Sequence, residues 1–168
     1  LPGVGAFRDR MHNLEQGGFV EPILKVITDG RPFLGICVGM QLLFTDSMEF
    51  GLYSGLNVIP GHVLRFPDQM TVGGEKLKVP QMGWNQLSFK RRPPAFNGVS
   101  DGSNVYFVHS YYLQAEDPQI VKATTEYGVT IHASVEKDNI FACQFHPEKS
   151  SKYGLKILEN FAKLGKEA

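Results

Sequence analysis

Several features that mark whole classes of protein are scarce in this sequence of 168 residues. Lysine and arginine together number 17, and so do aspartate and glutamate, so there is no positive excess of the kind that nucleic-acid-binding proteins carry. There are only two cysteines, too few for a disulfide framework. No apolar run approaches the roughly 18 residues of a membrane-spanning helix, and no signal peptide is recognisable. These absences favour a cytoplasmic protein that binds neither nucleic acid nor a membrane.

The length and a hydrophobic content of 42% favour one folded domain with a substantial core. Strand-like and helix-like segments follow one another without repeats or linkers, which predicts a single α/β domain over residues 1–168. We expect helices over 7–14, 20–27 and 153–164, strands over 32–36, 56–66, 76–89, 105–108, 121–126, 129–135 and 140–145, and turns at 73–74 and 127–128. The chain opens at Leu1 and enters a Pro-Gly turn at once, so we expect that its beginning is missing.

The strongest functional pattern lies between Leu34 and Phe44. The apolar run that ends at Ile36 predicts a buried parallel strand, and the apolar residues from Met40 onward predict a helix that ends between residues 47 and 51. Between strand and helix stands Gly-x-Cys-x-Gly, the sulfur counterpart of the Gly-x-Ser-x-Gly nucleophile elbow. The spacing therefore makes Cys37 a candidate nucleophile.

The residue types around Cys37 fit such a turn. Gly35 and Gly39 lack the Cβ atoms that would collide where a strand turns sharply into a helix. The helix N-terminus should favour the thiolate of Cys37, which is the reactive form. The alternative is a buried packing cysteine beside loop glycines, so the motif needs a base elsewhere in the chain.

A candidate base occurs in Phe145-His146-Pro147-Glu148, directly after the strand predicted over 140–145. His146 would lie at the carboxyl end of a strand, where α/β sheets place their chemistry, and Glu148 is close enough to orient the imidazole. The alternative is a solvated loop histidine beside a helix N-terminal glutamate. The remaining histidines lack such a carboxylate and are interpreted as surface or core residues: His12, His62, His109 and His132. Cys143 is interpreted as strand packing, and no set of residues has metal-ligand spacing.

Taken together, these motifs resemble the class I (triad) glutamine amidotransferases. The runs Pro2 to Phe7, Val79 to Asn85 and Phe145 to Ser151 narrow the resemblance to the glutaminase subunits of imidazole glycerol phosphate synthases. The resemblance extends from Leu1 to the closing helix. It implies a flavodoxin-like three-layer domain with a central mixed, largely parallel sheet, and an N-terminally incomplete chain, since relatives begin roughly a βαβ unit (~30 residues or more) earlier.

The resemblance implies hydrolysis of L-glutamine to glutamate and ammonia without a metal or cofactor. The ammonia would pass to a (β/α)8-barrel cyclase subunit, the partner in a heterodimer of histidine biosynthesis. The implied roles are a catalytic triad of Cys37, His146 and Glu148, oxyanion donors at the N–H groups of Val38 and Val4, substrate contacts from Gln41, Glu49, Ser110 and Tyr111, and a partner interface that includes Trp84 and Lys149.

The sequence departs from the pattern of this family at two points, and three alternative interpretations remain open. Gln81 stands where relatives often have histidine, and the missing start removes at least one expected strand. Trp84 could instead be core packing. The chain could serve another synthase, although the run Met82-Gly83-Trp84-Asn85 argues against that. It could also be a catalytically silent module that only docks to the partner.

Overall fold

A six-stranded mixed sheet forms the centre of the computed structural model, which describes residues 1–167, with side chains through residue 165. The strands in spatial order are β1 (Pro2–Gly3), β2 (Phe33–Cys37), β14 (Ile140–Cys143), β13 (Thr130–Lys137), β12 (Val121–Glu126) and β9 (Ser88–Phe89). Strand β2 pairs in parallel with β1 on one side and β14 on the other. The candidate nucleophile therefore ends a strand that is held from both edges.

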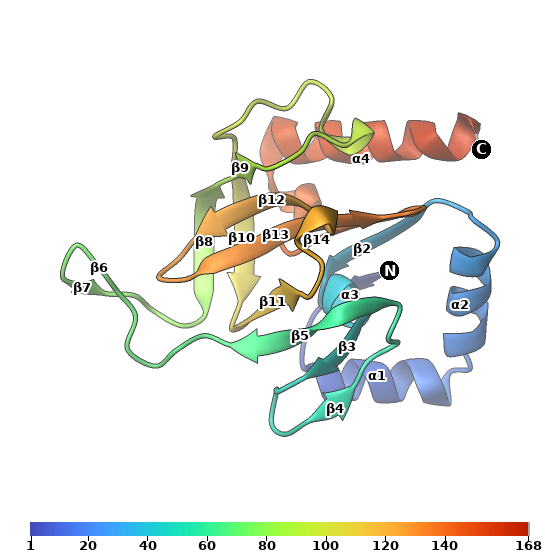
Figure 1. Cartoon of the computed structure of the whole chain (residues 1–168), viewed down its shortest axis with the longest axis horizontal. Helices are drawn as coiled ribbons and strands as arrows, with labels where there is room; N and C mark the ends of the chain where they lie inside the picture. The colour runs from blue at the N-terminus through green and yellow to red at the C-terminus, as the bar shows by residue number, and fades with distance from the viewer. Residues whose placement is uncertain (168) are drawn as a thin grey trace.

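Helices and a second sheet cover the two faces of this central sheet (Figure 1). Helix α4 (Ser151–Glu167) lies on one face. Helix α1 (Phe7–Gln16) lies on the other side, with the four-stranded sheet of β11 (Tyr111–Ala115), β5 (Ile59–Arg65), β3 (Phe44–Ser47) and β4 (Tyr53–Ser54). Helix α2 (Val20–Thr28) leads into β2. This arrangement confirms the predicted layered α/β domain.

The smaller elements complete the chain. Strands β8 (Gln81–Gln86) and β10 (Asn104–His109) pair in an antiparallel two-stranded sheet, and β6 (Thr71–Val72) and β7 (Glu75–Lys76) form a hairpin around the predicted turn at 73–74. Three short 3-10 helices are η1 (Pro94–Phe96), η2 (Pro118–Ile120) and η3 (Pro147–Lys149). The predicted helices over 7–14, 20–27 and 153–164 are confirmed as α1, α2 and α4.

Strand β14 shows how two apolar cores form on opposite faces of the sheet. Ile140 and Ala142 pack into the core shared with α1 and the four-stranded sheet, whereas Phe141 and Cys143 pack into the core beneath α4. The strand alternates between the cores because successive side chains of a strand point to opposite faces. Cys143 is fully buried, which confirms its interpretation as packing.

The helix predicted after the elbow is wrong beyond Gln41. Helix α3 spans only Val38–Gln41, and the next residues form β3. The carbonyl groups of Leu42 and Phe44 accept hydrogen bonds from the N–H groups of Leu56 and Asn57 instead of closing further helical turns. Apolar spacing alone could not reveal this, because a long-range backbone pairing overrides the local pattern.

The central sheet is mixed, as predicted, but parallel pairing is confined to β1, β2 and β14. The pairs β14–β13, β13–β12 and β12–β9 are antiparallel. Tight turns join β12 to β13 and β13 to β14, and a tight turn can connect only antiparallel neighbours.

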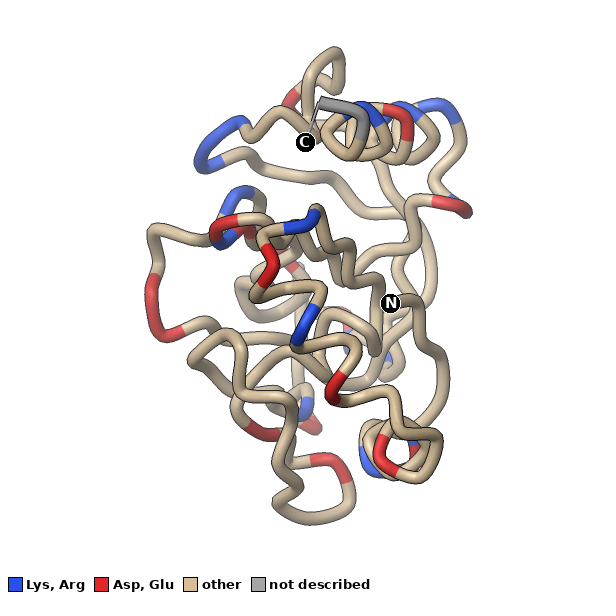
Figure 2. Tube along the Cα trace, turned by 90° about the vertical axis from the view of Figure 1, so that its right-hand side faces the viewer, with Lys and Arg blue, Asp and Glu red and all other residues tan. Residues whose placement is uncertain are grey.

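Charged residues of both signs are interspersed along the chain in Figure 2. None of the helices in the described part of the chain is long and apolar enough to cross a membrane.

The close approach of helix α4 to the turn that carries His146 can be tested with two glycines of the helix. A Cβ atom at Gly154 would overlap the carbonyl oxygen of Pro147, whereas a Cβ atom at Gly165 in the same helix would have no neighbour within 4 Å. We therefore expect Gly154→Ala to lower the free energy of unfolding by about 1–3 kcal/mol, because two backbones would have to separate. Gly165→Ala should be neutral or raise it by up to about 1 kcal/mol. Urea unfolding of both variants measures this difference, and equal effects would contradict the close approach.

Candidate active site

The sharp turn predicted between β2 and α3 is present at Cys37. Its φ of 54° and ψ of −116° place a non-glycine residue in a region that L-residues rarely adopt, as expected for a nucleophile elbow. Gly39 is required by packing, since a Cβ atom there would overlap the carbonyl oxygen of Leu1. Gly35 faces Met40, Leu43 and Ala142 at distances that leave little room for a side chain. The elbow interpretation of this motif is thus confirmed in its geometry.

The turn after β14 carries the imidazole of His146. Its Nδ1 lies 2.7 Å from Oε1 of Glu148, while the imidazole is almost fully buried and the carboxylate is half-exposed. The backbone N–H of His146 donates to the carbonyl of Tyr106 at 2.9 Å. The hydroxyl of Ser150 donates to the carbonyl of His146 at 2.6 Å and accepts from the N–H of Tyr106 at 2.9 Å. Strand β10 therefore fixes the backbone of this turn, and Glu148 fixes the ring.

One cavity of about 270 Å³ brings most of the predicted site residues together. A space of this size suits a small-metabolite ligand. Nine of the predicted residues line it: Val4, Cys37, Val38, Gln41, Glu49, Ser110, Tyr111, His146 and Lys149. Glu148 lies behind the imidazole and is not part of the lining, and neither is Trp84.

The sulfur of Cys37 makes contacts that the sequence did not predict. Its Sγ lies 3.8 Å from the carbonyl oxygen of Val108 and 3.7 Å from Nε2 of Gln144. Among the hydrogen bonds of the described residues none joins Cys37 to His146, although both line the cavity. The two groups are therefore assembled on one cavity without being bonded in this state.

The N–H group at the start of α3 lowers the pKa of Cys37, as expected, but burial of the sulfur outweighs it. Burial raises the pKa of its thiol to about 11, and the negative charge of Glu148 adds to the rise, while hydrogen bonds from Val38 and Gln144 lower the pKa. Helix α3 has only four residues, so its dipole is weak against the desolvation of a nearly buried sulfur. The resting group at neutral pH is the thiol, and a base must remove its proton before attack.

Gln41 and Glu49, predicted from the resemblance to contact substrate, are already engaged within the protein. The amide Nε2 of Gln41 donates to the carbonyl of Tyr111 at 3.2 Å and to Oε1 of Gln144 at 2.9 Å. The carboxylate of Glu49 accepts the backbone N–H of Phe7 at 2.6 Å, at the start of α1. Burial raises the pKa of Glu49. These hydrogen bonds use neither Oε1 of Gln41 nor the second carboxylate oxygen of Glu49.

Sequence reasoning missed two buried residues at the site. His109, interpreted earlier only as a surface or core residue, lines the cavity, with Nδ1 2.8 Å from the carbonyl of Tyr111 and Nε2 2.7 Å from the amide of Gln81. Burial lowers the pKa of His109 to about 4, so its ring is neutral at pH 7. Gln144 was missed although it directly precedes Phe145-His146 and follows the apolar positions of β14 at a spacing of two, which places it on the face of Cys37.

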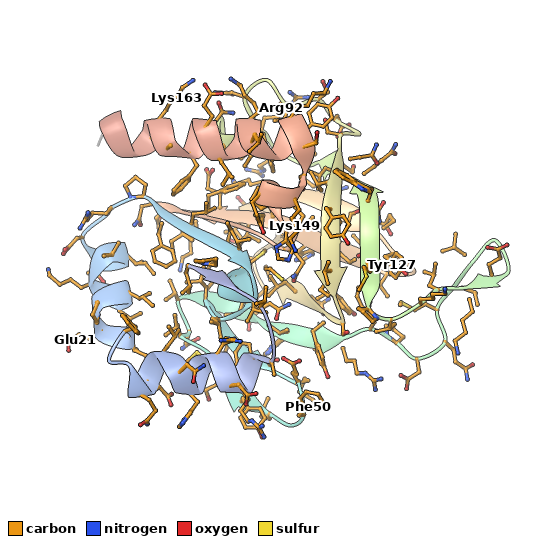
Figure 3. The ribbon with its side chains drawn as sticks, turned by 180° about the vertical axis from the view of Figure 1, so that it is seen from behind. Glu21, Phe50, Arg92, Tyr127, Lys149 and Lys163 are labelled. Atoms are coloured by element: carbon orange, nitrogen blue, oxygen red, sulfur yellow. The ribbon has the colours of Figure 1, made fainter. Side chains whose placement is uncertain are left out.

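Of the two predicted partner-contact residues, Lys149 lines the cavity and Trp84 does not. Trp84 is 55% exposed, which excludes the core-packing alternative, and its ring meets Tyr106 edge-on at 5.8 Å between centroids. Met82, two residues earlier on the same face of β8, is also exposed. Figure 3 shows Lys149 between the first turn of α4 and helix α3.

The predicted oxyanion donor Val4 is exposed, and its carbonyl accepts a hydrogen bond from the guanidinium of Arg10.

Within the described residues, no group of three or more His, Cys, Asp or Glu side chains is arranged to hold a metal ion. The chemistry supported by the side chains in the cavity is nucleophilic attack by sulfur with acid–base help from an imidazole.

The raised pKa of Cys37 predicts an unusual pH dependence of alkylation. Only the thiolate reacts with iodoacetamide, so the rate at Cys37 should rise about tenfold per pH unit and level off only near pH 11, whereas an exposed cysteine levels off near its ordinary pKa. Peptide mass spectrometry separates Cys37 from the buried Cys143. A plateau below pH 8 would show that the resting group is a thiolate after all.

Comparison with known proteins identifies the family of this chain. The profile of the family described as "Glutamine amidotransferase class-I" matches residues 1–164. The chain is 72% identical over 164 residues to "Imidazole glycerol phosphate synthase subunit HisH" of Geobacter sulfurreducens, covering 98% of this chain and 78% of that protein. It is 48% identical over 168 residues to the protein of the same description from Moorella thermoacetica, covering 100% and 77%. A crystal structure of a glutamine amidotransferase shares the fold with a TM-score of 0.68 at 17% identity, over 98% of this chain and 77% of that one. A glutamine amidotransferase from Thermotoga maritima gives 0.62 at 16% identity, over 99% and 62%. The chain belongs to the class-I glutamine amidotransferase family.

Proposed function

We propose that this chain is the glutaminase subunit of an imidazole glycerol phosphate synthase. It hydrolyses L-glutamine to glutamate and ammonia and delivers the ammonia to a (β/α)8-barrel cyclase subunit, which forms the imidazole ring in histidine biosynthesis. The observation that carries the proposal is one small cavity that holds a cysteine on a nucleophile elbow and a carboxylate-oriented histidine. The identity of 72% to a HisH subunit supports the choice of reaction and partner. Both cysteines are free thiols, which suits a reducing cytoplasm.

Attack begins with a proton transfer. The thiol of Cys37 has a pKa of about 11, so His146 takes its proton as the sulfur adds to the carboxamide carbon of glutamine. Glu148 accepts the Nδ1–H of the ring, which leaves Nε2 as the basic nitrogen and stabilises the imidazolium that forms. In the resting cavity the sulfur is not bonded to His146, so the pair closes when substrate enters.

The negative oxygen of the tetrahedral intermediate needs N–H donors. The amide of Val38, the residue after the nucleophile, is the first, and the amide of Val4 in the adjoining loop is the second. His146 then gives its proton to the leaving nitrogen, and ammonia departs with the electron pair of the C–N bond. Water, deprotonated by His146, cleaves the thioester and releases glutamate.

Substrate binding uses the rim of the same cavity. The free oxygens of Gln41 and Glu49 accept hydrogen bonds from the α-ammonium group of glutamine. The backbone N–H groups at Ser110 and Tyr111 receive the α-carboxylate.

This chain is proposed to produce the ammonia and the cyclase to close the ring. These separate roles predict the activities of Cys37→Ala in the complex with the cyclase. Glutamine-dependent synthesis should fall by at least about a thousandfold, because the nucleophile is gone, whereas synthesis from added ammonium salt should persist. The matched control is Cys143→Ala, which changes the other cysteine and leaves the cavity intact, so both activities should remain. Loss of both activities in folded Cys37→Ala would contradict the proposal.

Trp84 provides a test of the partner face. We expect Trp84→Ala to weaken binding of the cyclase by about thirtyfold, or about 2 kcal/mol, because a large rigid aromatic side chain is the type that anchors interfaces. The matched control is Phe19→Ala, since Phe19 is 56% exposed and lies between α1 and α2. Titration calorimetry measures both affinities. Unchanged affinity with a lowered melting temperature would mean that Trp84 serves only the stability of β8.

A further inference from the structure

Gln144 occupies a position that the proposed reaction leaves without a role. It follows β14 and is fully buried, and its side chain points to the face of the sheet that carries Cys37. Its amide lies between two residues of the site. Nε2 is 3.7 Å from Sγ of Cys37, and Oε1 is 2.9 Å from Nε2 of Gln41. The backbone N–H of Gln144 is held by the carbonyl of Ala133 at 2.9 Å.

The side-chain amides of Gln41 and Gln144 can be oriented in only one way that satisfies their hydrogen bonds. The side-chain amide of Gln41 donates both of its N–H groups, one to the carbonyl of Tyr111 and one to Oε1 of Gln144. Reversing the amide of Gln144 would set its NH2 group against the NH2 group of Gln41, and both would lose their bonds in a buried site. The NH2 group of Gln144 therefore has to face the sulfur.

This direction has a consequence for Gln41. Because both of its N–H groups are used inside the protein, the only free atom that its amide presents to the cavity is Oε1, which is an acceptor. A ligand group at that place must donate N–H, as an ammonium or a primary amide does, whereas a carboxylate would be repelled.

We propose that Gln144 is a positioning residue with two functions: its oxygen fixes Gln41 as an acceptor for substrate N–H groups, and its NH2 group directs a hydrogen bond to the sulfur of Cys37. The proposal rests on the proposed glutaminase activity for the first function only. The second concerns a contact within the protein and holds whatever the substrate is. A glutamine that merely filled the core would show neither effect.

The second function is supported by the direction of the pKa of Cys37, which the hydrogen bond from Gln144 lowers against the larger effect of burial. A thiolate formed during the reaction would gain more from this donor than the resting thiol does, because hydrogen bonds to charged acceptors are stronger. Gln144 therefore eases the proton transfer from Cys37.

Two substitutions separate the functions. Gln144→Met keeps the approximate volume and removes both hydrogen bonds. Gln144→Glu, when ionised, keeps an acceptor for Gln41 and removes the donor to Cys37. Both are made in the chain assembled with the cyclase. The first measurement is the KM for glutamine. The second is the rate of alkylation of Cys37 by iodoacetamide at pH 8, followed by peptide mass spectrometry, which needs no recognition of glutamine. Melting temperatures confirm that each variant is folded.

For Gln144→Met we expect a KM about tenfold higher and alkylation about tenfold slower, the loss of roughly one hydrogen bond at each place. For Gln144→Glu we expect a KM within about threefold of the parent, with alkylation slowed at least as much as in the methionine variant. Unchanged KM and alkylation in folded Gln144→Met would overturn the proposal.

The partial outcomes are equally informative. Equal increases of KM in both variants would overturn the role toward Gln41, and unchanged alkylation in Gln144→Glu would overturn the role toward Cys37. If the parent complex failed to hydrolyse glutamine, the proposed function would fail, while the alkylation rates would still decide whether Gln144 contacts the sulfur.

Discussion

The backbone conformation of Cys37 can persist only because its surroundings leave it no alternative. A non-glycine residue with a φ of 54° costs on the order of 1–3 kcal/mol relative to an ordinary conformation. Strand β2 is hydrogen-bonded on both edges, by β1 and β14, so it cannot relax by leaving the sheet. The carbonyl of Leu1 lies against Gly39, which fixes where the chain can go after the turn. The first residues of the chain and the elbow thus hold each other in place.

The side chains of strand β14, which point alternately to the two faces of the sheet, connect this elbow to both apolar cores. On β14, Phe141 and Cys143 pack beneath α4, and Phe145 continues the same core. The residues between them face the opposite core, and Gln144 extends that series toward Cys37. Strand β14 and the residue that follows it therefore pack against the helix layer on one face and contact Cys37 on the other, before the chain turns to His146. A one-residue shift of register would exchange the two faces and remove the site.

The parts of the site that the sequence could predict are those encoded by local geometry. Gly-x-Cys-x-Gly required a tight turn, and two residues of separation brought Glu148 to the ring of His146. The parts that it could not predict depend on distant segments. The length of α3 was set by backbone bonds from residues 56–59, and the surroundings of His109 were set by the pairing of β8 with β10. The motif indicated the N–H group that favours the thiolate of Cys37, but it does not encode burial, which raises the pKa more than that N–H group lowers it.

The burial of the Cys37 thiol also gives a reason for the polar groups that surround it in the cavity. With a pKa of about 11, the fraction of thiolate at pH 7 is about one in ten thousand, so very little of the reactive form is present at rest. Catalysis then requires a base within reach, donors for the charged sulfur and a ligand that draws these groups together. In the proposed reaction His146 is the base, and Gln144 and the N–H of Val38 are the donors, each from a separate segment. Because the donors lower the pKa of Cys37 less than burial raises it, the resting thiol is protonated, and in the proposed reaction it loses its proton only as glutamine is attacked.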